Sequence, residues 1–162
     1  MKRAISFVTV IAMLIAMAMP ASIFAGDEEP AALIVSTECL EDGSYFETTI
    51  ETETTSEPSL FSTRTTVSGS KAVTYKNSNN ATMWYVIVHG TFSYSGTSAT
   101  CTKVTGSMTS KSSNWKVSNL KTSRSGNAAT ASANGKGYRA GSVVETKTHT
   151  VTLKCSAKDN LY

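Results

Sequence analysis

The stretch MWYVIVHGTFSY, residues Met83–Tyr94, decides the fold class of this chain. Its residues alternate between two faces. One face carries Trp84, Val86, Val88, Phe92 and Tyr94, and the other carries Tyr85, Ile87, His89, Thr91 and Ser93. This period of two residues is typical of a β-strand with one buried side. Ser95-Gly96 predicts a turn and Ser98–Val104 a returning strand, which together make an antiparallel hairpin.

The region that follows Phe61 repeats this pattern. Ser and Thr make up 34 of its 102 residues, and short β-branched and aromatic runs are separated by Gly, Asn and Ser. Further strands are predicted at Lys71–Tyr75, Trp115–Leu120, Ala128–Ala133 and Val143–Ser156, with turns at Ser125–Asn127 and Asn134–Gly137. No sustained helical period occurs. We expect an all-β domain of six to eight strands: an antiparallel, immunoglobulin-like β-sandwich or, alternatively, a small β-barrel.

Residues 1–25 have the pattern of a secretory signal peptide. Lys2 and Arg3 precede an uncharged apolar run, which ends at Pro20, and Ala25 supplies a small residue at the expected cleavage point. The alternative is a retained membrane anchor, but the run is shorter than the about 20 residues that a spanning helix needs. We therefore expect a secreted protein that is either released or held at the cell wall, with no stable membrane insertion after cleavage.

Charge divides the rest of the chain into two regions. Residues 26–60 contain ten acids and no Lys or Arg, whereas residues 61–162 contain thirteen bases and two acids, Glu145 and Asp159. The acidic segment has little to bury and is predicted to be largely disordered. Two exceptions are Ala31–Val35, which could add an edge strand, and Tyr45-Phe46, which could dock on the basic, Ser/Thr-rich β domain at 61–162.

The cysteines suggest a cross-link. Cys101 and Cys155 both fall in predicted strands, export permits disulfides, and a bond between the two would stabilise by roughly 4 kcal/mol. Trp115 lies between them, which resembles the tryptophan that packs on the inter-sheet disulfide of immunoglobulin domains, although Leu153 stands where those domains carry a tyrosine. The alternative is that the cysteines are buried and reduced. Cys39 could be free, pair between chains or displace one partner.

No catalytic or metal-binding motif is recognisable. The chain lacks HExxH, a phosphate-binding Gly-rich loop and GxSxG. Glu145 and Asp159 are too few for a two-carboxylate mechanism in the basic region, and His89 and His149 would lack a third zinc ligand. We expect a protein that is not an enzyme and uses neither a cofactor nor a metal.

The basic residues are better suited to binding. They are spread along the region, which argues against a nucleic-acid groove and favours a diffuse positive surface. An anionic cell-wall polymer or an acidic glycan is the expected partner; the alternative is that these lysines protect edge strands from aggregation. The candidate ligand-binding residues are the densest basic group and the two aromatic side chains expected to be exposed: Lys111, Lys116, Lys121, Arg124, Tyr85 and Tyr138.

The sequence WYVIVHGTFSYSGTSATCT at Trp84–Thr102, followed by Trp115, resembles a segment of small exported proteins of Gram-positive, clostridia-like bacteria. The shared pattern is W, then GTFxYxGxSAxCT, then a second W, and it covers approximately Lys71–Cys155. The resemblance implies a β-rich secreted fold. It supplies no catalytic or binding residue, because that group has no established function.

Two functions remain as hypotheses. The first is a secreted, non-enzymatic β-sandwich that binds an anionic cell-wall polymer or glycan. The alternative is a processed structural or effector protein whose acidic N-terminal segment shields the basic domain.

Overall fold

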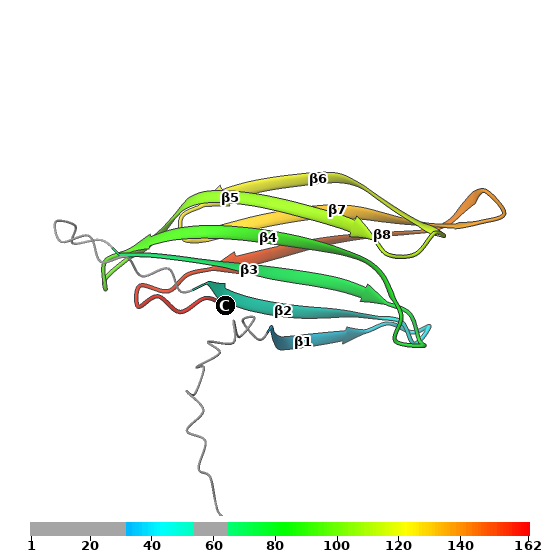
Figure 1. Cartoon of the computed structure of the whole chain (residues 1–162), viewed down its shortest axis with the longest axis horizontal. Coiled ribbons are helices and arrows are strands. Elements are labelled where there is room, and N and C mark those ends of the chain that lie inside the picture. The colour runs from blue at the N-terminus through cyan, green and yellow to red at the C-terminus, as the bar shows by residue number, and fades with distance from the viewer. Residues whose placement is uncertain (1–31, 54–64) are drawn as a thin grey trace, which may run out of the picture.

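Eight antiparallel strands form two sheets in the computed structural model, which describes residues 32–53 and 65–162. The strands are β1 (Leu33–Cys39), β2 (Tyr45–Glu53), β3 (Thr65–Lys76), β4 (Thr82–Tyr94), β5 (Ala99–Ser110), β6 (Trp115–Ser125), β7 (Ala128–Arg139) and β8 (Ser142–Lys154). The sheets have the orders β1-β2-β3-β4-β5 and β6-β7-β8 and are not closed into a barrel. The predicted β-sandwich is therefore confirmed (Figure 1). The predicted signal peptide and the boundary at residue 60 lie outside the described residues.

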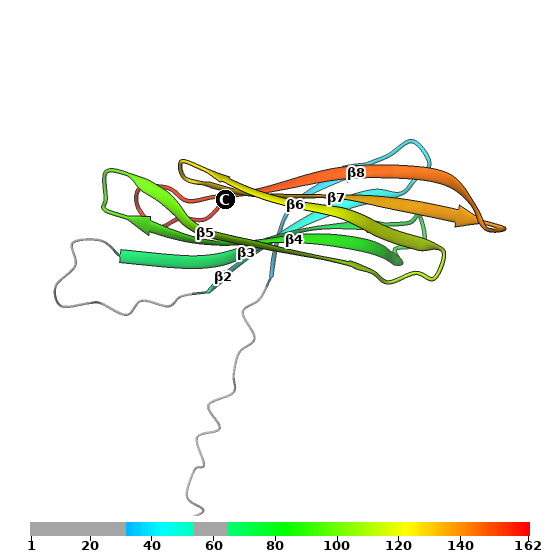
Figure 2. The same ribbon diagram turned by 90° about the horizontal axis from the view of Figure 1, so that it is seen from above.

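Each strand pairs with its neighbour in the sequence, so both sheets are meanders. The chain passes from one sheet to the other only once, between β5 and β6, and the long strands of both sheets run along the same axis of the molecule (Figure 2). Immunoglobulin domains instead use Greek-key connections, in which each sheet contains strands distant in sequence. The strand order thus differs from that of the immunoglobulin-like sandwich that the sequence suggested.

The core lies between β3–β5 and β7–β8. The alternation predicted for β4 is confirmed, because Trp84, Val86, Val88 and Phe92 have no exposed surface. The facing strand β7 contributes only small inward residues: Ala129, Ala131, Ala133, Gly135 and Gly137. Large side chains on one sheet therefore pack against small ones on the other, which allows the two sheets to approach closely.

Two glycines of β7 make room for the two tryptophans. A Cβ atom at Gly135 would lie 2.4 Å from Cε2 and Nε1 of Trp84, and one at Gly137 would lie 3.1 Å from Cζ2 of Trp115. The turn predicted at Asn134–Gly137 is wrong, because β7 continues to Arg139. These glycines permit close approach of an aromatic ring within a strand.

The acidic segment contributes two strands, although it was predicted to be largely disordered. Phe46 of β2 is buried, with its ring centroid 5.1 Å from that of Tyr75 and 6.0 Å from that of Trp84. All nine residues of β2 pair with β3, and these contacts offset the entropy cost of ordering. The prediction of disorder is therefore wrong for β1 and β2. The expected edge strand is confirmed for Leu33–Val35, and so is the docking of Phe46.

All three cysteines are free in this structure, so the Cys101–Cys155 disulfide stays a prediction. Cys101 and Cys155 are buried, and their Sγ atoms lie 3.3 Å from the Lys103 carbonyl oxygen and 3.2 Å from that of Ser156. Desolvation raises the pKa of both thiols. The two side chains thus fill the core as small apolar groups. Trp115 packs on Tyr75, with ring centroids 5.0 Å apart, and not on a disulfide.

We predict that the thiols react in two classes. In the native protein Ellman's reagent should modify exposed Cys39 quickly, while Cys101 and Cys155 stay protected because they are buried and their protonated form is favoured. In denaturant without reductant all three should react. Reaction of a single thiol in the denatured protein would instead show that the two buried cysteines are oxidised to a disulfide.

A second prediction concerns the contact between Trp84 and Gly135. Gly135→Ala should lower the free energy of unfolding by about 1–3 kcal/mol, because the new methyl group overpacks the indole. In a Trp84→Phe background the same substitution should cost less, since the smaller ring leaves space. Gly137→Ala is the matched control with a milder contact. Denaturant unfolding of wild type, Gly135→Ala, Trp84→Phe and the double variant gives the coupling energy between positions 84 and 135. Strictly additive effects would contradict the assignment.

Candidate functional site

The outer face of the three-stranded sheet gathers lysines and hydroxyl groups. Strand register sets Lys116 beside Lys136 and Thr146, Lys121 beside Ser132 and Thr150, and Lys154 beside Ala128. Further outward positions in these strands are polar: Ser118, Ser123, Ser125, Thr130, Asn134, Thr148 and Thr152. We call this surface the cationic face, defined by Lys116, Lys121, Lys136, Lys154 and these polar residues.

The cationic face carries no carboxylate from β6–β8. Glu145 is the only acid in these three strands. Glu145 pairs in register with Gly137, and Gly137 faces Trp115 on the inner side of the sheet. Glu145 therefore also lies on the inner side, opposite to the cationic face. Four positive charges therefore lie on one surface without an acidic neighbour in the sheet.

Local sequence explains how the lysines reach one side. In β7 the small residues occupy alternate inward positions, which turns Ser132, Asn134 and Lys136 outward. In β6 strict alternation would place Lys116 and Lys121 on opposite faces. A bulge between Ser118 and Lys121, with Asn119 at a φ of 59°, inserts one residue and returns Lys121 to the outer side.

The six predicted ligand-binding residues do not form one site. Lys116 and Tyr138 come together, with Nζ of Lys116 5.2 Å from the ring centroid of Tyr138, a cation–π distance. Lys121 shares their sheet face. Lys111, in the connection between β5 and β6, forms a second pair with Tyr85 of β4: its Nζ lies 5.7 Å from the Tyr85 ring centroid.

Arg124 has a structural position. Its guanidinium donates to the backbone carbonyls of Cys101 and Thr102 on β5, so it links the two sheets and does not lie on the cationic face. The sequence prediction instead missed Lys136 and Lys154. The sequence contains a pattern that places both lysines. Every second residue from Ala129 to Gly137 in β7 is small and inward, and Val151 and Leu153 in β8 are apolar and inward, which assigns Lys136 and Lys154 to the outer side.

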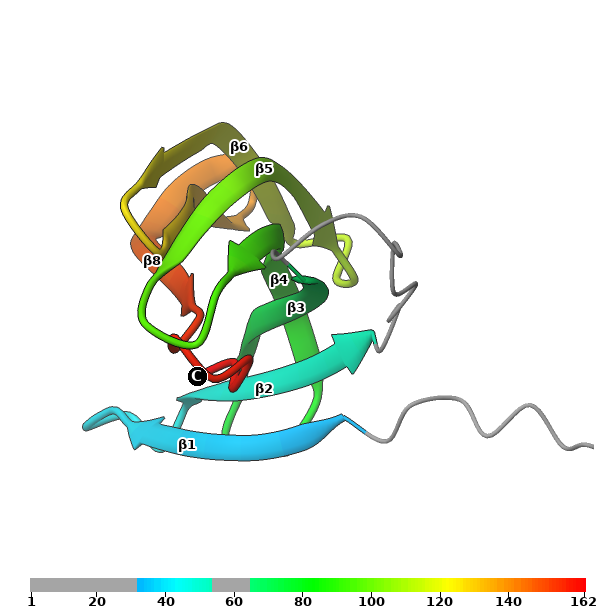
Figure 3. The ribbon, with the colours of Figure 1, turned by 90° about the vertical axis from the view of Figure 1, so that its left-hand side faces the viewer.

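Three of the described acids of the N-terminal segment lie on the outer side of the other sheet. Glu47, Glu51 and Glu53 alternate along β2 on the outer side of the five-stranded sheet. Glu47 pairs with Lys76 of the adjacent strand at 2.8 Å. Seen end-on, β1 and β2 lie at the opposite end of the sandwich from β6 (Figure 3). These strands therefore leave the cationic face uncovered.

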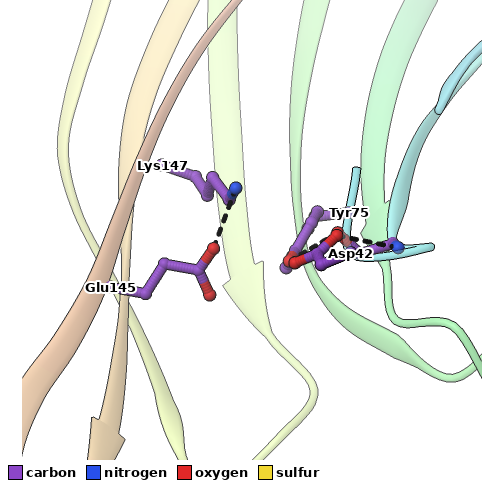
Figure 4. A network of polar contacts seen from close by, with 5 residues as sticks. Asp42, Tyr75, Glu145 and Lys147 are labelled. Atoms are coloured by element: carbon purple, nitrogen blue, oxygen red, sulfur yellow. Dashed lines mark hydrogen bonds and ion pairs between the residues drawn. The ribbon is translucent and has the colours of Figure 1, made fainter. Parts of the chain in front are cut away.

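A cluster of titratable groups closes one end of the sandwich (Figure 4). The Tyr75 hydroxyl donates to Oγ of Ser44 at 3.0 Å, Ser44 donates to Asp42, and Lys147 pairs with Glu145 at 2.8 Å. Desolvation raises the pKa of Tyr75, the hydrogen bonds from Ser44 lower the pKa of Asp42, and the bond to Glu145 raises the pKa of Lys147.

Each of these shifts favours the protonation state that the group already has at neutral pH. A general acid or base instead needs a pKa near the working pH. The cluster therefore fits a structural role. Its hydrogen bonds tie the β1–β2 turn to β3, and Nζ of Lys147 on β8 lies 6.0 Å from the ring centroid of Tyr75.

The two histidines lie on different sides of the molecule. His89 is on the outer face of β4, whereas His149 of β8 points inward and stacks on Phe46 with centroids 4.5 Å apart. Within residues 32–53 and 65–162, no three His, Cys, Asp or Glu side chains gather as metal ligands would. In the same ranges the structure contains no helix with the length and hydropathy of a membrane span.

Comparisons of the chain with protein-family models, with curated proteins and with solved structures find no match. Only the geometry and charge of this chain itself therefore indicate its function.

We predict a pH dependence of stability that arises at His149. Burial lowers the pKa of its imidazole below the usual 6.5. The unfolded chain then takes up the proton first, so this contribution to stability is present above about pH 6.5 and is lost as the pH falls below it. The melting temperature should drop between about pH 7.5 and 5.5.

The drop should be smaller in His149→Gln. His89→Gln is the matched control, because it removes a histidine far from Phe46 and should keep the wild-type dependence. Equal pH profiles of wild type and His149→Gln would contradict the assignment.

Proposed function

We propose that the protein is a secreted, non-enzymatic β-sandwich that binds an anionic cell-wall polymer or glycan through its cationic face. The observation that carries this proposal is the convergence of Lys116, Lys121, Lys136 and Lys154 on one sheet face that has no carboxylate of its own strands. Attraction to a polyanion needs such an uncompensated charge.

The form of the face suits an extended ligand. Adjacent strands lie about 4.8 Å apart, and outward residues repeat about every 6.8 Å along each strand. Hydroxyl and ammonium groups thus form a regular grid on an open surface. A linear polymer of phosphates or acidic sugars can contact several rows at once, and hydroxyl groups can hydrogen-bond both sugars and phosphate oxygens. Tyr138 adds a ring at the end of the grid, beside Lys116.

The alternative, an acidic segment that shields the basic domain until proteolysis, has less support. Its described strands belong to the five-stranded sheet, where Glu47 pairs with Lys76. Removal of the chain up to residue 60 would also strip Phe46 from Tyr75 and Trp84. A segment that completes the core is poorly suited to be discarded.

The test is salt-dependent retention on purified cell wall and on isolated anionic wall polymer. Wild type should bind at low salt and elute by about 0.5 M salt, because the Debye length then falls to a few ångströms. Replacement of the four lysines of the cationic face by Gln should weaken binding roughly tenfold to hundredfold, since each exposed charge contributes a few tenths to about 1 kcal/mol.

Lys103 and Lys158 supply the control. Both are exposed and lie outside the three-stranded sheet, so their double replacement by Gln should change affinity far less. Binding that survives the fourfold substitution, or that both variants weaken equally, would refute the assignment to the cationic face.

A further inference from the structure

An apolar groove lies on the inner side of β1 and β2, where the three-stranded sheet does not cover them. Its volume is about 590 Å³, within the roughly 300–1,000 Å³ typical of small-molecule sites. Apolar side chains form most of the lining: Leu33, Val35, Ile50, Leu161 and Tyr162. Leu33 is 67% exposed, Val35 42% and Tyr162 51%, so this surface is open to solvent.

The far wall of the groove is held firmly. The last residues return antiparallel to the end of β8, with hydrogen bonds in both directions between Lys154 and Tyr162 at 2.9 and 3.0 Å. Leu161 then enters a space that Gly69 of β3 leaves open, since a Cβ there would lie 2.4 Å from Cδ1 of Leu161. The C-terminus consequently lies between β8 and β2 (Figure 3).

One cation enters this apolar surface. Lys71 of β3 shares the inward side with Ile50 and Val88, its partners in register, and it lines the groove. It is half-buried, and no carboxylate of the described residues forms an ion pair with it. Burial and then the nearby charge of Lys154 lower the pKa of its ammonium group. The hydroxyl groups of Ser36 and Thr52 lie along the same groove.

We propose that this groove binds a free fatty acid, with the carboxylate at Lys71 and the acyl chain along Leu33, Val35, Ile50 and Leu161. A half-buried ammonium without a counter-ion favours a ligand that brings one negative charge. Ser36 and Thr52 can donate hydrogen bonds to a carboxylate. The apolar walls gain from covering an alkyl chain, as any exposed apolar surface does. None of the groove-lining residues belongs to the cationic face, although the charge of Lys154 lies near Lys71.

The experiment is calorimetric titration of the full chain with dodecanoate below its micelle concentration, and with dodecanol as the uncharged ligand of equal chain length. Wild type should bind dodecanoate more tightly. Lys71→Met keeps an apolar stem and removes the charge. It should weaken dodecanoate binding roughly tenfold and leave dodecanol binding within about twofold.

Leu33→Ser should weaken both ligands, because the exposed leucine forms a groove wall and contributes no charge. Val144→Ser is its matched control, since Val144 is similarly exposed but lies on β8 outside the groove. Circular dichroism and melting of each variant separate loss of binding from loss of fold.

Three results would overturn the proposal. The first is no dodecanoate binding by a folded wild type. The second is equal loss of both ligands in Lys71→Met. The third is a different occupant. Dimerisation in sedimentation that Leu33→Ser abolishes would assign the groove to a second copy of the chain. Binding to anionic phospholipid vesicles that Leu33→Ser abolishes, without binding of dodecanoate, would assign it to a lipid surface.

Discussion

The fit of the Trp84 indole against the backbone of Gly135 sets the distance between the two sheets. The indole is fully buried. Any side chain at position 135 larger than hydrogen would overlap the ring, so the ring or the strand would have to move. Phe46, Tyr75 and Trp115 surround this contact as one aromatic group. The indole Nε1–H has no hydrogen-bond partner in the part of the chain that the structure describes. An unpaired buried donor costs free energy, so the packing of this ring has to exceed that cost.

β7 is small on its inner side and polar on its outer side. Ala129–Gly137 contributes little buried volume, and the core volume comes instead from β4. The outer positions of β7 then carry Ser132, Asn134 and Lys136, which form the middle of the cationic face. The proposed binding surface and the core are thus two sides of one alternating strand.

Sequence patterns predicted the elements whose two faces differ clearly. Trp84–Tyr94 could be assigned to a half-buried strand because every second residue is large and apolar. Gly135 and Gly137 were assigned to a turn, since glycine in a single sequence does not reveal that a ring from another sheet packs against it. The acidic composition of β2 predicts disorder because only Phe46 of that strand is buried in the structure, and its partners Tyr75 and Trp84 come later in the chain. Lys121 could not be placed with Lys116, because the bulge at Asn119 changes the parity between them.

The meander order has a consequence for how the chain acquires its structure. Every strand within a sheet finds its partner in the segment synthesised just before it, so each hairpin closes a short loop at a small entropic cost. A chain that emerges from its N-terminus can extend the first sheet strand by strand, without waiting for a distant segment. The contact between Trp84 and Gly135 instead joins the two sheets across many intervening residues, as the contact between Leu161 and Gly69 does. These packing contacts therefore close much longer loops than the hairpins do.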